Sequence, residues 1–173
     1  MSQTALLRLM LLLSPSFPVG AFAYSSGLEQ AVADGLVTDA AGLEGWLLAA
    51  LDGGSIRNDA ILLAEAHRVA ASNEALQSVA DLAAALAGSK QRHMETLAQG
   101  AAFVDAVKAT ALALPDFADP PAYPVAVGAV GSMQGLELAQ TIAAYLHAFA
   151  SNQIQCGIRL GVLGQNGGVA LLE

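Results

Sequence analysis

The sequence predicts an all-α protein, a single-domain helical bundle. Apolar residues recur at helical spacing along nearly the whole chain. No segment alternates apolar and polar residues as a half-buried strand would, and no internal repeat or second domain is evident. At 173 residues, the chain is long enough to bury one sizeable core.

The first apolar run, residues 5–13, predicts a helix that ends before Pro15 and Pro18. It contains Arg8 and is too short to cross a bilayer, so we expect no transmembrane span. Residues 21–23 have the small-x-small pattern of a secretory cleavage site. The interrupted apolar run and its single basic residue favour a shaped turn instead, with export as the alternative.

The turn leads into a second predicted helix. Ser26 and Glu29 have the spacing of a capping box, in which hydroxyl and carboxylate each accept from a backbone N–H at the helix start. A cap does not explain why Phe22 and Tyr24 stand in a turn that we expect to be exposed. We therefore treat this turn as a candidate contact surface.

Four amphipathic helices are predicted next, because their apolar residues fall on one face and Ser, Thr or Gly mark their ends. They cover residues 38–54 with Thr38 as N-cap, 55–72 with Ser55 as N-cap, 76–88, and 89 to about 114.

A proline-rich loop follows, and Pro124 is placed to begin the next helix. Gly128, Gly131 and Gly135 lie at i, i+3 and i+7, which leaves one face of that helix without side chains. Glycine costs a helix about 1 kcal/mol relative to alanine, so the pattern predicts a close helix crossing that recovers the loss. An irregular loop is the alternative.

The last long helix, about residues 138–160, is predicted to be central. We assign residues 1–160 to one domain. Residues 161–173 contain four glycines, so we expect a flexible tail that a partner orders.

Composition excludes several functions. The net charge is −8, and the seven Lys and Arg residues are scattered, which argues against nucleic acid. An acidic surface fits either a basic protein partner or a role in solubility alone. Phosphate-binding GxxxxGK[ST] and catalytic GxSxG motifs are absent, and the three histidines fall on different predicted helices. We expect no enzyme, metal site or cofactor. The single cysteine, Cys156, favours a reducing compartment.

An apolar content of 55% and a mean hydropathy of +0.53 exceed what one small monomer covers easily. This indicates either a location at a membrane or burial of the excess surface against a second copy or other proteins. Polar side chains share a helix face in two places, which predicts either solvated faces or contact points. These sets are Arg92, Glu95 and Gln99, and Asn152, Gln155 and Arg159.

Three segments carry a family resemblance: LLSPSFPVGAFAYSSGLEQAV from residue 12, SKQRHMETLAQGAAFV from residue 89, and the long segment from YPVAVGAVGSMQG at residue 123 to LGQ at residue 165. Together they resemble the UreF family of urease accessory proteins.

The resemblance implies a cytoplasmic, all-α, non-enzymatic chaperone, usually a homodimer. Such proteins link UreD, also called UreH, to the GTPase UreG for nickel incorporation into apo-urease. The residues carried over as partner-binding candidates are Phe22, Tyr24, Ser25, Glu29, Arg92, Glu95, Asn152, Arg159 and Gln165. The alternative function is a helical protein that binds a lipid or hydrophobic ligand, after export.

Overall fold

A computed structural model describes residues 2–173, and over this range the chain is all-helical without strands. The elements are α1 (Gln3–Leu12), the 3-10 turn η1 (Ala21–Ala23), α2 (Leu28–Ala33), α3 (Ala40–Gly53), α4 (Ser55–Val69), α5 (Asn73–Ala85), α6 (Lys90–Lys108), α7 (Tyr123–Met133), α8 (Leu138–Arg159) and α9 (Gln165–Leu172). The predicted fold class is therefore confirmed.

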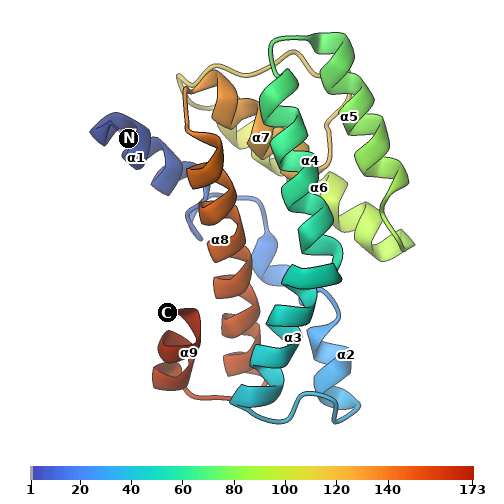
Figure 1. Cartoon of the computed structure of the whole chain (residues 1–173), viewed down its shortest axis with the longest axis vertical. Coiled ribbons are helices and arrows are strands. Elements are labelled where there is room, and N and C mark those ends of the chain that lie inside the picture. The colour runs from blue at the N-terminus through green and yellow to red at the C-terminus, as the bar shows by residue number, and fades with distance from the viewer. Residues whose placement is uncertain (1) are drawn as a thin grey trace.

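The helices build an elongated bundle around two long columns (Figure 1). Helices α3 and α4 follow one another along one column, and α8 runs beside both of them. Helices α5, α6 and α7 gather at the α4 end, whereas α2 and α9 lie at the α3 end. Helix α1 lies at the edge of the bundle. The central position predicted for the last long helix is thus correct.

The core follows this division. Helix α7 is the most deeply placed element, with every residue from 124 to 131 buried between α4, α6 and α8. A second apolar cluster joins α4, α5 and α7, and a third joins α2, α3 and α8 at the other end. Cys156 is buried in the third cluster, as expected of a small core residue.

Helix starts agree with the sequence in part. Ser89 caps α6 at its predicted start by accepting from the backbone N–H three residues later. Ser72 caps α5 in the same way, but α5 begins at Asn73, three residues before the predicted start at residue 76. Two predicted caps are wrong by one residue: Asp39, not Thr38, caps α3, and Gly54 precedes α4, in which Ser55 is the first residue. Both differences lie within the usual uncertainty of helix ends.

The three glycines near α7 have different surroundings. A Cβ on Gly128 would lie 2.2 Å from the Leu63 carbonyl oxygen of α4, whereas one on Gly131 would meet the Thr141 side chain at 3.3 Å. Gly135 lies beyond the end of α7, with φ of +67° and no atom within 4 Å of a Cβ. Gly135 therefore lies outside the contact between helices and closes a turn, in a backbone conformation that residues with a side chain rarely adopt. A role of the three glycines in a dimer stays a prediction.

The C-terminal segment, predicted as a flexible tail, contains helix α9. This helix packs on α8 and α3, and its Gly168 is buried against Ile154 and Ile158 of α8. The segment therefore has a place on the bundle, and its ordering by a partner stays a prediction.

Helix α1 has apolar side chains on both faces. Leu9 and Leu12 are buried in the main core, but the other large apolar residues of the helix are exposed: Leu6, Leu7, Met10 and Leu11. None of the helices formed by residues 2–173 has the length and apolarity that a membrane span requires.

The contact between α7 and α4 predicts that substitution by alanine changes stability in opposite directions at two glycines. Gly128→Ala should lower the free energy of unfolding by about 1–3 kcal/mol, because the new Cβ meets backbone that cannot rotate away. Gly45→Ala, at an exposed position of α3 with open space around it, should stabilise the protein by up to about 1 kcal/mol. Urea unfolding of both variants measures this difference, and a Gly128→Ala protein as stable as wild type would contradict it.

Candidate functional site

Two features stand out at the middle of the bundle: a tight loop over residues 14–27 and a buried polar cluster beneath it. The cluster consists of Asp59 on α4, Arg92, Glu95 and Gln99 on α6, and Tyr145 on α8. The two features adjoin, and together they border the hollows described below.

Glycine conformations shape the loop. Gly20 and Gly27 have φ of +71° and +89°, and Ser26 has φ of +49°, the one positive value for a non-glycine residue among those described. The predicted capping box is wrong: Gly27 precedes α2 and no side chain caps the helix. Ser26 has a left-handed backbone conformation and lies one residue before the N-cap position. Glu29 is exposed in the first turn.

Side chains of α8 hold the loop by hydrogen bonds to its backbone. Asn152 Nδ2 donates to the carbonyl oxygens of Ala21 at 3.1 Å and Tyr24 at 3.3 Å. Arg159 Nη2 donates to the carbonyl oxygen of Phe22 at 3.3 Å. The Phe22 side chain itself is 75% exposed. The structure thus gives Asn152 and Arg159 a role within the chain, and their direct contact with a partner stays a prediction.

An aromatic series connects the loop to the polar cluster. The rings of Phe17, Phe103, Tyr123 and Tyr145 follow one another with centroid separations of 5.3, 5.7 and 5.5 Å. Such tilted and edge-on pairs favour a fixed relative orientation. The series ends at the Tyr145 hydroxyl, which donates to Asp59 Oδ2 at 2.9 Å.

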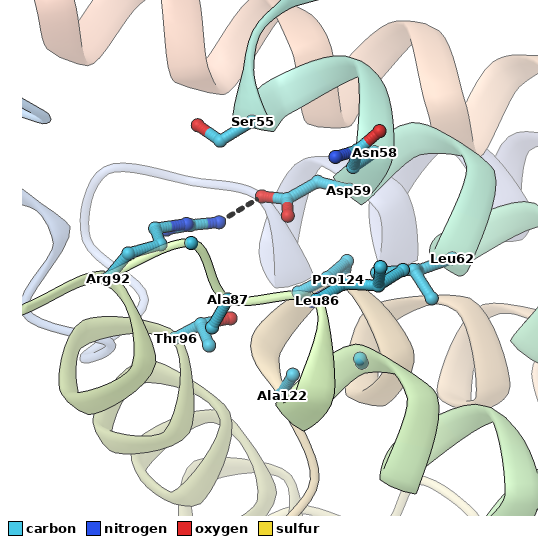
Figure 2. Close-up of a pocket in the computed structure, with 12 residues that line it drawn as sticks. Ser55, Asn58, Asp59, Leu62, Leu86, Ala87, Arg92, Thr96, Ala122 and Pro124 are labelled. Carbon is cyan, nitrogen blue, oxygen red and sulfur yellow. Dashed lines mark hydrogen bonds and ion pairs between the residues drawn. The ribbon is translucent and has the colours of Figure 1, made fainter. Parts of the chain in front are cut away.

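The polar cluster places two carboxylates around one guanidinium. Arg92 Nη2 lies 2.5 Å from Asp59 Oδ2, and its Nη1 lies 3.2 Å from Glu95 Oε1. Asp59 and Glu95 are 7% and 9% exposed, so water screens these charges poorly. Gln99 Nε2 donates to Glu95 Oε1 at 3.4 Å. Figure 2 shows the Arg92 guanidinium pointing at the Asp59 carboxylate across the space between α6 and α4.

Burial and charge shift the ionisation of this cluster. Burial raises the pKa of the Glu95 carboxyl; Arg92 opposes the rise, and the second carboxylate, Asp59, adds to it. Burial disfavours the charge on Arg92, but Asp59, Tyr145 and Glu95 outweigh it and raise the pKa of the guanidinium. Burial, with Asp59 next in effect, also raises the pKa of Tyr145, so its hydroxyl is a neutral donor.

Small cavities flank the ion pair. One of about 40 Å³, shown in Figure 2, lies between α4, α5 and α6 and is lined by Thr96, whose buried hydroxyl has no partner among residues 2–173. It is large enough for a water molecule. A second, of about 70 Å³, lies on the side of the loop and is lined by the whole polar cluster together with Ser26, Ser55 and Asn152.

Two larger grooves open to the surface. The loop–α6 groove, about 730 Å³, runs between Ala23–Gly27 of the loop and the start of α6, with Arg92 and Glu95 in its lining. The loop–α8 groove, about 530 Å³, is bordered by Leu13–Phe22 and by α8 residues that include His147, Asn152 and Arg159.

The grooves bring most of the predicted residues together. Tyr24, Ser25, Arg92 and Glu95, which are distant in sequence, line the loop–α6 groove. The loop–α8 groove collects three more: Phe22, Asn152 and Arg159. Two predicted residues, Glu29 and Gln165, line neither groove.

Sequence reasoning missed Asp59, the acceptor at the centre of the cluster. The available signal was its position, since Asp59 shares a face of α4 with the buried Ile56, Leu63 and Ala66. A carboxylate on such a face needs a partner. Groups of three or more side chains able to hold a metal are absent from residues 2–173, and His67 bonds the Leu136 carbonyl oxygen at 2.8 Å.

The chain is similar to known proteins over most of its length. The UreF family model matches residues 37–173, most of the chain. The chain belongs to the UreF family. It is 55% identical over 170 residues to urease accessory protein UreF 1 of Brucella suis biovar 1, covering 98% of this chain and 75% of that protein.

Two other members of the UreF family are similarly related. Urease accessory protein UreF of Rhizobium johnstonii is 54% identical over 173 residues, covering 97% of this chain and 76% of that protein. Its counterpart in Allorhizobium ampelinum is 53% identical over 176 residues, with 97% and 76% covered. The family resemblance seen in the sequence is thereby confirmed.

The polar cluster predicts a large cost in stability for one substitution and a small cost for another. Arg92→Met leaves two buried carboxylates without their cation and should cost about 3–5 kcal/mol of unfolding free energy at pH 8. Glu95→Gln keeps the shape of the side chain and leaves one balanced ion pair, so its cost should stay below about 1 kcal/mol.

The pH dependence follows from the raised pKa of Glu95. A carboxyl whose pKa is higher in the folded than in the unfolded state loses stabilisation as pH rises through the folded value. Glu95→Gln removes this loss. Between about pH 4 and pH 8, the range above the usual glutamate pKa, the free energy of unfolding of the variant should therefore rise relative to that of wild type. Urea unfolding across this range checks both variants; parallel wild-type and Glu95→Gln curves would contradict the raised pKa.

Proposed function

We propose that this protein is a urease accessory protein that acts as an adaptor in the cytoplasm and has no catalytic activity of its own. In this role it bridges UreD (UreH) and the GTPase UreG, works as a homodimer, and supports GTP-dependent nickel incorporation into apo-urease. Membership in the UreF family carries the proposal, because the relatives are named urease accessory protein UreF.

The shape of the surface supports an adaptor. Large apolar side chains are exposed on α1, and Phe22 projects from a loop held by three side-chain hydrogen bonds. An aromatic side chain on an ordered support loses little conformational freedom when a partner buries it. Phe22 and Tyr24, with Ser25 beside them, are therefore our leading contact residues.

The remaining candidates divide by position. Arg92 and Glu95 reach a partner only through the loop–α6 groove. Asn152 and Arg159 act at least through the loop that they hold, whereas Glu29 and Gln165 are exposed outside both grooves. We assign the α6 residues to the homodimer or the UreG side, and the α8 and tail residues to the UreD side.

The alternative function is a carrier of lipid or another hydrophobic ligand. The cavities beside the Asp59–Arg92 pair, about 40 and 70 Å³, are much smaller than pockets for such ligands, about 300–1,000 Å³. The loop–α6 and loop–α8 grooves have the required size, but charged side chains such as Arg92, Glu95 and Arg159 line them, which favours a protein partner over a lipid.

Phe22 provides the test of the adaptor role. Wild-type protein should co-purify with UreD and UreG from a co-expressed urease operon, and Phe22→Ala should weaken this association at least tenfold, as loss of a hot-spot aromatic does. Leu36→Ala is the matched control, since Leu36 is 73% exposed and lies away from the loop. Binding of the purified variants measures the effect.

Nickel-dependent urease activity in a reconstituted mixture should follow the same order. Wild-type protein that neither associates with UreD and UreG nor raises this activity would refute the adaptor role. Equal losses for the two variants would refute the special role of Phe22.

A further inference from the structure

The polar cluster has one negative charge more than its own side chains balance. Asp59 and Glu95 both contact Arg92, the one basic side chain of the cluster. Replacing the hydration of a buried carboxylate requires compensation by a cation, a proton or several donors. Glu95, the less strongly paired of the two carboxylates, therefore lacks a compensating cation.

Two carboxylate oxygens are free to accept another donor. The hydrogen bonds of Asp59 end on Oδ2, and those of Glu95 end on Oε1. Among residues 2–173, Asp59 Oδ1 and Glu95 Oε2 have no hydrogen-bond partner, and neither atom is fully buried. Both residues line the cavity of about 70 Å³, which has room for several water-sized groups.

The cavity adjoins the loop–α6 groove. Ser26, Ser55, Arg92 and Glu95 line both the cavity and the loop–α6 groove. The groove is also lined by the exposed Ala23 and Met94 and by exposed polar residues such as Gln91. Glu95 is buried, so an approaching side chain would pass these residues before it reached the Glu95 carboxylate.

A lysine side chain matches this order of surfaces. Its four-carbon stem packs on apolar groups while its compact ammonium donates three hydrogen bonds. The planar guanidinium of arginine is larger and needs a flat, forked acceptor. An acidic chain, with net charge −8, also attracts a basic partner.

We infer that the loop–α6 groove is a docking site for a basic protein segment, with one partner lysine inserted so that its ammonium binds Glu95 and Asp59 beside Arg92. This inference rests on the proposed adaptor function and adds the chemistry of one contact to it. The partner's ammonium supplies the cation that an ionised Glu95 lacks, and at pH values where Glu95 is still protonated it displaces the proton.

The charged and titratable groups around Glu95 fit this exchange. Asp59 faces it from α4, Arg92 from α6, and the neutral hydroxyls of Tyr123 and Tyr145 border the same cavity from α7 and α8. Because burial already raises the pKa of Glu95, an incoming cation should lower it and release a proton.

Calorimetry tests the inference with UreD and UreG co-purified from the same operon as the titrant. Wild-type protein, Glu95→Gln and the exposed control Glu44→Gln would be titrated at several pH values between about 5 and 8, each in two buffers whose ionisation heats differ. Wild type and Glu44→Gln should bind with proton release, seen as a buffer-dependent enthalpy, in the part of this range in which Glu95 titrates. Glu95→Gln should bind about tenfold more weakly and lose that release.

A second arm needs no partner protein. Millimolar n-butylammonium, a mimic of the lysine side chain, should raise the melting temperature of wild type more than that of Glu95→Gln, and more than tetramethylammonium or sodium at equal ionic strength. Failure of wild type to bind UreD and UreG would refute the proposed function alone, since this arm still tests the site.

Several results would overturn the inference itself. One is equal affinity and equal proton release for wild type and Glu95→Gln. Another is the absence of any n-butylammonium effect that depends on Glu95. A third is binding of Ni²⁺ alone to wild type but not to Glu95→Gln, which would make the site a metal site.

Discussion

The ion cluster of Asp59, Arg92 and Glu95 is the constraint on which the middle of this molecule depends. It is one of few charged contacts in a chain with 13% charged residues, and it joins α4 to α6 across the bundle. The Tyr145 hydroxyl adds α8 to the same acceptor. Buried ion pairs contribute modest net stability, but each fixes one arrangement of its helices because a misplaced partner leaves an unpaired charge.

The loop over residues 14–27 depends on the same helices. Tyr145 and Asn152 lie on α8, so the helix that completes the cluster also holds the loop through the carbonyl oxygens of Ala21 and Tyr24. Aromatic contacts from Phe17 to Tyr145 link the two features a second time. The grooves are consequently framed by elements that cannot shift independently.

Much of this arrangement could be predicted from local patterns, and the rest could not. Helical spacing and proline or serine positions placed α5 to α8 because these signals act within a few residues. The capping box at Ser26 failed because the loop backbone is held by Asn152, more than 120 residues away. The three glycines at helical spacing were equivalent in the sequence. The tertiary structure is needed to distinguish Gly128, which packs against α4, from Gly135, which lies in a turn.

The functional site shows the same limit. Motifs identified Tyr24, Arg92 and Arg159 individually, but the grooves that unite them arise from tertiary packing. Asp59 was visible only as a carboxylate on an apolar helix face, and its partner on α6 could not be known from spacing. Local sequence patterns therefore predict the helices of this chain but not the long-range pairing of its charges.

The most direct measurement is the ionisation of the Glu95 carboxyl itself, followed by carbon NMR of protein labelled at glutamate side chains. With Glu95→Gln used to assign the signal, we predict a pKa above the usual glutamate value in the free protein. We also predict that it falls when the UreD and UreG partners bind. An ordinary pKa in the free protein, unchanged in the complex, would contradict an underbalanced cluster that a partner's cation completes.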